Sequence, residues 1–170
     1  MSFAEFEKAI VSKDLKSVAR HWEEARAGKQ MPSWRDLQPK RIAGQLPIVW
    51  SYTYDPASDA FTGRLAGDRI AKIFGKDFRG LTMKEAYPKH DYPRLFARSK
   101  RVIIEPALYH GLGMVFRHLD RLGYGERIIM PLGTSGVSDG ILGATDYPMD
   151  FSRERPEIDC EPEVDSWFSY

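Results

Sequence analysis

The spacing of apolar residues changes along the chain, and the order of these changes restricts the fold more than any single motif does. In residues 48–54, large side chains at every second position alternate with Val, Ser and Thr, and this period of two predicts a strand. A turn at residues 55–60 and an apolar run at residues 61–66 then predict a hairpin. Three further strand-like runs lie at residues 108–118, 126–133 and 138–146.

Helical spacing fills most of the remaining sequence. Ser2 and Glu5 have the spacing of a capping box, which favours a helix at the N-terminus. Helices are expected near residues 3–10, 14–27, 67–74, 81–86 and 93–105. The order of helices, two strands, helices and three strands predicts an α+β domain. Its expected core is a five-stranded antiparallel sheet with helices on one face and an N-terminal helical extension.

The composition is that of a globular domain. The chain has 170 residues, of which 42% are hydrophobic and 29% are charged. We find no apolar run of about 18 residues and no pattern of a signal peptide, so we expect a cytoplasmic protein. A single cysteine, Cys160, excludes an internal disulfide and a site with several cysteine ligands.

The net charge of +1 conceals an uneven distribution. Residues 150–170 carry seven acidic and two basic residues, a net charge of −5, which leaves +6 for the rest. We expect this tail either to be mobile or to dock electrostatically on its own body or a partner. Trp167, Phe168 and Tyr170 leave open a tail packed by its apolar end.

The glycine-rich stretch RLAGDRIAKIFGKDFRGLT, residues 64–82, has the outline of a nucleotide-binding turn. Its glycines, Gly67, Gly75 and Gly80, do not have the spacing of a dinucleotide fingerprint, and no lysine and hydroxyl pair follows as in a P-loop. We therefore interpret Gly67 as permitting a tight strand-to-helix turn and Gly75 as a helix cap. An anionic ligand beside Arg69 remains an alternative.

No catalytic or metal-binding motif emerges. The run TSGVSDG, residues 134–140, lacks the spacing of a serine nucleophile elbow and fits a turn between strands. The four histidines, His21, His90, His110 and His118, show no metal-ligand spacing. We predict no catalytic residue and no metal site.

Four segments together resemble the PAS fold, and more closely a family of small single-PAS-domain proteins common in alphaproteobacteria. They are HWEEARAGKQMPSWRDLQP (21–39), QLPIVW (45–50), FTGRLAGDRIAKIFGKDFRGLT (61–82) and ERIIMPLG (126–133). The resemblance implies a sensory or scaffold domain, without a defined ligand. We divide the chain into an N-terminal helical extension (1–30), a PAS-like domain (31–148) and an acidic tail (149–170).

The resemblance also bears on cofactors. Haem-binding relatives often use a histidine of the long helix, but residues 91–105 contain none, so haem through His90 or His110 is a weak alternative. Flavin photosensors use a helical cysteine, whereas Cys160 lies in the tail. We expect no obligatory cofactor.

A ligand cavity would lie between the sheet and the helices. Its candidate lining residues are Trp50, Tyr52, Arg69, Ile73, Met114, Phe116 and Met130. Such residues more often form ordinary core. The apolar stripes of the N-terminal helices must be buried against the body or against another copy. We expect a homodimer through Phe3, Phe6, Ile10, Leu15 and Trp22.

These observations favour a PAS sensory or adaptor domain that acts in signal transduction through contacts with a protein partner. A small enzyme using the same cavity is one alternative, although no set of catalytic groups supports it. A nucleic-acid-associated adaptor is another, based on the basic body. The basic stripe of Arg94, Arg98 and Arg101 fits a solvated helix face, or a surface that receives the acidic tail.

Overall fold

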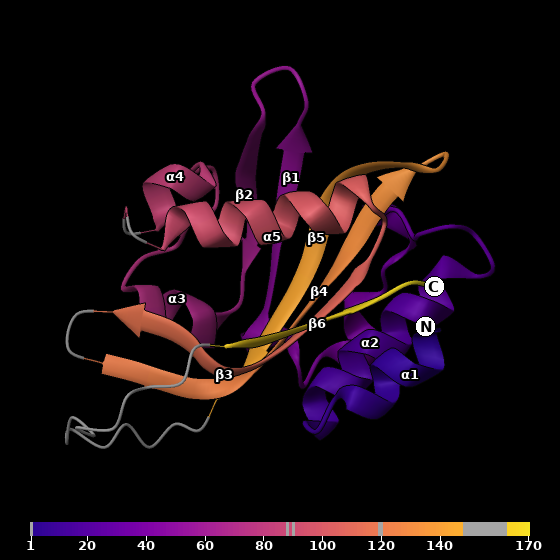
Figure 1. Ribbon diagram of the computed structural model, residues 1–170, viewed down its shortest axis with the longest axis horizontal. Helices are drawn as coiled ribbons and strands as arrows, with labels where there is room; N and C mark the ends of the chain where they lie inside the picture. Colours follow the sequence, from indigo (N-terminus) through magenta and orange to yellow (C-terminus); the bar gives the residue numbers. More distant parts are fainter. Residues whose placement is uncertain (1, 88, 90, 119–120, 148–162) are drawn as a thin grey trace.

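The structure is a computed structural model that describes residues 2–87, 89, 91–118, 121–147 and 163–170 (Figure 1). Its centre is an antiparallel sheet with the strand order β2-β1-β5-β4-β3-β6. The strands are β1 (Val49–Asp55), β2 (Ala60–Ala66), β3 (Leu108–His118), β4 (Arg121–Thr134), β5 (Val137–Asp146) and β6 (Val164–Phe168). The predicted α+β fold and its five antiparallel strands are confirmed, and β6 adds a sixth strand at the edge.

The helices follow the predicted order. They are α1 (Phe3–Ala9), α2 (Lys13–Arg26), α3 (Asp68–Phe74), α4 (Met83–Ala86) and α5 (Tyr92–Ile104). Three short 3-10 turns, η1 (Trp34–Asp36), η2 (Pro39–Ile42) and η3 (Leu46–Ile48), connect α2 to β1. Prolines at residues 32, 39 and 47 prevent a longer helix in this connection. No helix in the described ranges is both long and apolar enough to cross a bilayer.

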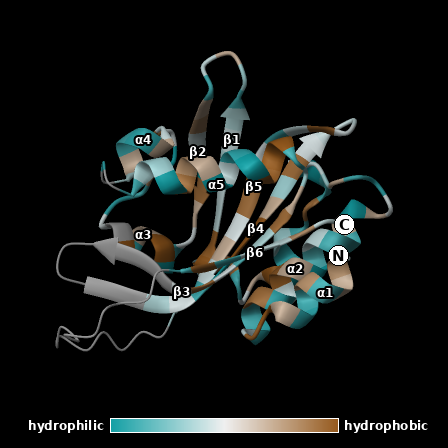
Figure 2. Ribbon diagram, viewed as in Figure 1, coloured by the Kyte–Doolittle hydropathy of each residue, from teal (hydrophilic) through white to brown (hydrophobic). Residues whose placement is uncertain are grey.

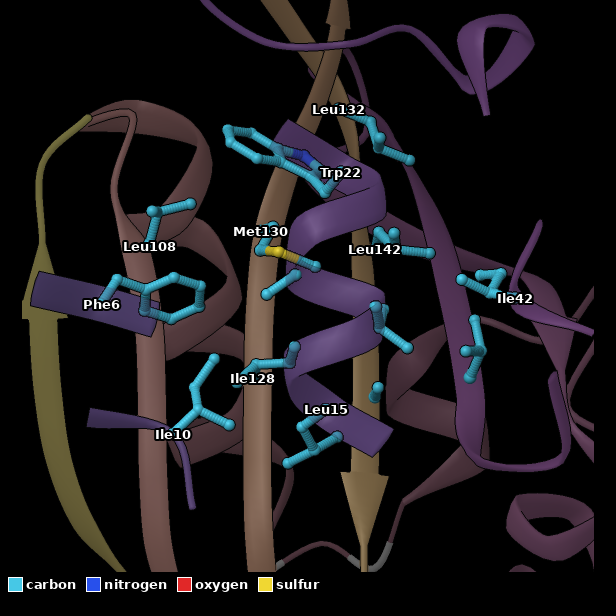
Figure 3. Close-up of a cluster of buried hydrophobic side chains, with 14 of the residues drawn as sticks. Phe6, Ile10, Leu15, Trp22, Ile42, Leu108, Ile128, Met130, Leu132 and Leu142 are labelled. Atoms are coloured by element: carbon cyan, nitrogen blue, oxygen red, sulfur yellow. The ribbon is translucent and has the colours of Figure 1, made fainter. Parts of the chain in front are cut away.

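Buried apolar residues form a core cluster on each face of the sheet, so each face needs a covering layer. Figure 2 shows hydrophobic residues along the strands of the sheet. In β4, Ile128 and Met130 face one side while Ile129 faces the other, because successive residues of a strand point in opposite directions. Helices α3, α4 and α5 cover one face, which we call the inner face. Helices α1 and α2 cover the opposite, outer face (Figures 1 and 3).

The N-terminal helices thus form a layer of the domain core. Phe6, Ile10, Leu15 and Trp22 are each at most 1% exposed and pack against β3, β4 and β5 (Figure 3). The indole Nε1 of Trp22 donates a hydrogen bond to the carbonyl oxygen of Pro131 at 2.8 Å. The apolar stripes of the N-terminal helices are therefore buried against the sheet of the same chain.

This placement corrects the assignment of the dimer interface. Four of the five side chains assigned to it, those of Phe6, Ile10, Leu15 and Trp22, are already buried against the chain's own sheet. Only Phe3 is partly exposed, and it stacks on Trp22 at 6.4 Å between ring centroids. A homodimer stays a prediction, and the four buried side chains are not available for its contact.

The glycine-rich stretch, residues 64–82, connects β2 to α4 and contains α3. A Cβ atom on Gly67 would lie 2.2 Å from the carbonyl oxygen of Leu46, so this site requires glycine for close packing. Gly75 ends α3 with a φ of 67°, which glycine adopts at little cost. The interpretation of Gly75 as a helix cap is confirmed, and Gly67 is required for close approach rather than for an unusual φ.

Candidate functional site on the inner face

The predicted cavity residues are only partly brought together. Trp50 and Tyr52 are buried in the inner-face core, and Ile73 packs against that core from α3. Arg69 lies at its edge, where Nη2 donates to the carbonyl oxygen of Tyr147 at 2.6 Å and the guanidinium lies 4.9 Å from the Tyr147 ring centroid. Arg69 therefore ties α3 to the end of β5.

The prediction that Met130 lines the cavity on the inner face is corrected. Its side chain is fully buried, but it belongs to the outer-face core beneath α1 and α2 (Figure 3). Strand alternation places Ile129 on the inner face in its stead. Met114 and Phe116 lie in the part of β3 whose side chains are outside the description.

Aromatic rings fill much of the described inner-face core. Tyr52 and Phe78 stack with their ring centroids 5.0 Å apart, and Phe61 packs edge-on against Phe96 at 5.8 Å. These contacts have the geometries that aromatic pairs favour. This part of the predicted lining is thus packed core, which was the alternative considered from the sequence.

Next to this aromatic core lies a buried cluster of charged residues. The guanidinium of Arg98 on α5 is 2.9 Å from the carboxylate of Glu163 and 3.1 Å from that of Asp165. Arg127 on β4 approaches the same Glu163 carboxylate at 3.5 Å. The side chains of Arg98 and Glu163 are only 4% and 3% exposed, so this ion pair is almost entirely removed from water. We call Arg98, Arg127, Glu163 and Asp165 the latch.

Strand β6 and the residue before it, Glu163, place these carboxylates beside α5. It pairs with β3 so that Asp165 lies opposite Gly111 and Trp167 opposite Tyr109. Alternation then points residues 163, 165 and 167 toward α5. The Tyr109 hydroxyl donates to Asp165 Oδ1 at 2.7 Å, which ties the neighbouring strand to the latch.

The basic stripe of α5 meets the tail along its length. Arg94 donates to the carbonyl oxygen of Glu163 at 2.9 Å, and the Arg101 guanidinium lies 4.1 Å from the Trp167 ring centroid. Together with Arg98, all three arginines of the stripe contact β6 or the residue that precedes it. The alternative that the stripe receives the acidic tail is confirmed for residues 163–168. Residues 149–162 of the predicted tail lie outside the described residues.

The end of the chain is also held by aromatic contacts on the outer face. Phe168 packs edge-on against Phe6 at 5.6 Å, and Tyr170 against Trp22 at 5.1 Å. This brings the two termini side by side (Figure 1). The tail is therefore attached both electrostatically and by its apolar end.

Burial shapes the ionisation of the groups around the latch. Burial alone would lower the pKa of Arg127, but the nearby carboxylates, Glu163 first, outweigh it and raise the pKa. Burial and the charge of Glu163 raise the pKa of Tyr109, which keeps its hydroxyl protonated and able to donate to Asp165. The arrangement is a stable set of fixed charges and donors that holds carboxylates.

A glycine makes room for the Glu163 carboxylate. A Cβ atom on Gly111 would lie 2.2 Å from Glu163 Oε1 and 2.3 Å from the Tyr109 hydroxyl oxygen. Neither atom could keep its position beside such a group. Gly111 is thus part of the latch geometry, although nothing in the sequence singled it out.

A second polar cluster on the outer face fixes the connection between α1 and α2. Glu126 accepts hydrogen bonds from the backbone N–H groups of Val11 and Ser12, each at 2.7 Å, and lies 2.7 Å from His110 Nε2. Ser12 also donates to Asp146 at 2.6 Å. His110 therefore has a structural partner. Among the described residues, no group of three or more histidine, cysteine or acidic side chains is placed to hold a metal ion.

The inner face of the antiparallel sheet is thus covered by short helices, and charged groups are buried beneath α5. Residues 11–145 match the PAS domain family, and the chain belongs to that family. A role in sensing and signal transduction follows from this membership. No curated protein and no solved structure gave a significant match.

Proposed function

We propose that this PAS protein is a signalling adaptor whose output passes through protein–protein contacts, with strand β6 as the element that responds to the signal. The observation that carries the proposal is the burial of Glu163 between Arg98 and Arg127. The chain thereby places its own C-terminal segment against the space between sheet and helices, which was expected to hold any ligand.

Two features make β6 suited to a switching role. It is a five-residue strand at the edge of the sheet, so its release leaves the other strand pairings unchanged. Its attachment also depends on buried charges, and a buried ion pair that loses one partner leaves an uncompensated charge at a large cost. A signal that alters the latch would therefore shift the population of docked β6 strongly.

In this proposal a small-molecule ligand takes the place of the Glu163 carboxylate in the latch. A ligand bearing a carboxylate would compete with Glu163 for Arg98 and Arg127, because it offers the same charge and hydrogen-bond geometry. Its binding would release β6, and a partner protein would respond to the exposed edge of β3.

We also propose a homodimer, with its contact on exposed residues near β3 and β6 instead of the N-terminal helices. Leu112 and Val164 lie opposite each other in the β3–β6 pairing and are 47% and 63% exposed. Val11 is 72% exposed and lies near them, since its N–H group binds Glu126, which pairs with Leu112. This exposed apolar row, Val11, Leu112 and Val164, is the dimer contact that we propose.

The adaptor proposal is tested by quantitative affinity purification from the native cells. Baits are the wild-type chain, a latch variant, Glu163→Gln, and a surface control, Asp77→Asn. We expect the amount of at least one co-purifying protein to change several-fold with Glu163→Gln and to be unaffected by Asp77→Asn. Identical recoveries with all three baits, while hydrogen exchange shows β6 released in the latch variant, would overturn the proposal.

A further inference from the structure

The outer face of the sheet carries a pocket that the core does not fill. Its volume is about 320 Å³, at the small end of the range for ligand sites. Helices α1 and α2 contact β3, β4 and β5 on this face, whereas residues of the 3-10 turns lie beside Val49 of β1 and Leu65 of β2. These turns are short because of their prolines, and the pocket lies between them, α2 and the sheet.

The walls of the pocket are predominantly apolar. Val49, Leu65 and Leu142 form its sheet side, and Leu46 and Ile42 come from the connection between α2 and β1 (Figure 3 labels Ile42 and Leu142). A β-bulge in the β1–β2 pairing, between Ser51 and Tyr52, shifts the register just before Leu65. The interior therefore suits an aliphatic or aromatic group.

The mouth of the pocket is basic. Arg35 is exposed there and, within the described part of the chain, forms neither an ion pair nor a hydrogen bond. Its neighbour Asp36 is already engaged, because its carboxylate accepts from Ser33 and lies 3.1 Å from Lys29. Arg41 adds a further positive charge close by, although it pairs with Glu24 at 3.0 Å. An acid would find a free guanidinium at this position.

A buried hydrogen-bond donor in the wall of the pocket, on His21, also favours a ligand with an acceptor group. His21 is 4% exposed, and its Nε2 accepts a hydrogen bond from the N–H group of Gln38 at 3.0 Å. The neutral ring therefore carries its proton on Nδ1, and this N–H has no acceptor among the described residues. Burial, followed by the charge of Arg41, lowers the pKa of His21, which favours this neutral form. A buried donor without an acceptor is unusual and costly.

From these observations we infer that the outer-face pocket binds a small organic acid with an apolar body, whose carboxylate pairs with Arg35. The apolar walls receive the body, and the basic mouth selects the acid over a neutral or cationic amphiphile. This site lies on the opposite side of the sheet from the latch, so its test does not depend on the function proposed above.

Isothermal titration calorimetry with three probes of equal chain length tests this inference on the full-length protein. The probes are octanoate, octan-1-ol and octylammonium. We expect octanoate to bind most tightly and octylammonium most weakly. Arg35→Gln should weaken octanoate binding by roughly two- to fivefold and leave octan-1-ol binding unchanged, as expected for loss of one exposed charge pair. Arg79→Gln, an exposed arginine on the segment between α3 and α4, is the matched control.

A second measurement does not depend on any variant. Amide chemical shifts of the wild-type protein should change on addition of octanoate at residues 34–46 and around Leu65, and not around Arg98. Filling the pocket with Leu65→Trp should remove binding of both octanoate and octan-1-ol. Binding of octylammonium as tight as that of octanoate, or shift changes centred on α5, would overturn the inference.

Discussion

The guanidinium of Arg98 and the carboxylate of Glu163 lie 2.9 Å apart, although 65 residues separate them in the sequence and both side chains are almost completely buried. One belongs to the helix that covers the inner face, and the other precedes the last strand of the sheet. This contact is the most deeply buried of the ion pairs that connect the C-terminal segment to the PAS domain. We therefore expect changes at this ion pair to have large effects on stability.

Removing one partner of this pair should destabilise the fold strongly. We expect Arg98→Met to lower the free energy of unfolding by about 3–5 kcal/mol, because Glu163 would be left as a buried, partly compensated charge. The double variant Arg98→Met with Glu163→Gln should lose less than the sum of the two single losses. Denaturant titrations of the four proteins give this coupling energy. Asp77→Asn, which breaks the exposed pair with Arg79, should have little effect.

The space beside Gly111 should tolerate no side chain. We expect Gly111→Ala to destabilise the protein by about 1–3 kcal/mol, since the new Cβ atom must displace Glu163 or Tyr109. Gly44→Ala is the matched control, because a Cβ atom at Gly44 meets nothing within 4 Å. Thermal unfolding of both variants measures the difference. Equal melting temperatures for the two would show that Glu163 does not occupy the place described.

The cluster around Glu126 predicts a defined pH dependence. Burial would raise the pKa of Glu126, but the hydrogen bonds from His110, Val11 and Ser12 outweigh it and lower the pKa below 4.5. A carboxylate with a lowered pKa stabilises the fold above its unfolded pKa, and this contribution is lost as the pH falls through the folded value. The stability difference between wild type and Glu126→Gln should therefore shrink as the pH falls below about 4.5. A difference that grows on acidification would contradict the assignment.

The proposed dimer contact can be separated from the fold. Sedimentation equilibrium should show a homodimer for the wild type and a monomer for Leu112→Lys with Val164→Lys, because both side chains are exposed within the chain. Val137→Lys is the control, since Val137 is 70% exposed outside the proposed row. A wild type that remains monomeric at high concentration, or a dimer that persists in the double variant, would remove this part of the proposal.

The sequence predicted the order of the elements because hydrophobic period is a local property. The predicted limits of β3 are those observed, whereas β4 begins at Arg121 rather than near residue 126. Gly123 and Gly125 favour a loop when the sequence is read alone. In the sheet their backbones pair with Phe116 and Gly113, and this pairing does not depend on side chains.

The site was less predictable because it depends on which face each strand presents. Alternation alone does not determine whether Ile129 or Met130 faces α5, and the prediction that Met130 lines the inner face is incorrect for this reason. The charge asymmetry and the stripe of Arg94, Arg98 and Arg101 did indicate a docking surface for the tail. Arg127, Tyr109 and Gly111 entered the site only through tertiary contacts. The alternation in EVDSWF, residues 163–168, was a usable signal that these acids share one side of a strand.

The central claim is that buried charges hold β6 to the domain, and hydrogen exchange at the backbone amides of residues 164–168 tests it most directly. The wild type should protect these amides, and Glu163→Gln should raise their exchange rates by at least about tenfold, with a smaller increase in β1 and β2. Asp77→Asn should exchange as the wild type does. Unprotected amides in wild-type β6, or equal protection in Glu163→Gln, would contradict the account.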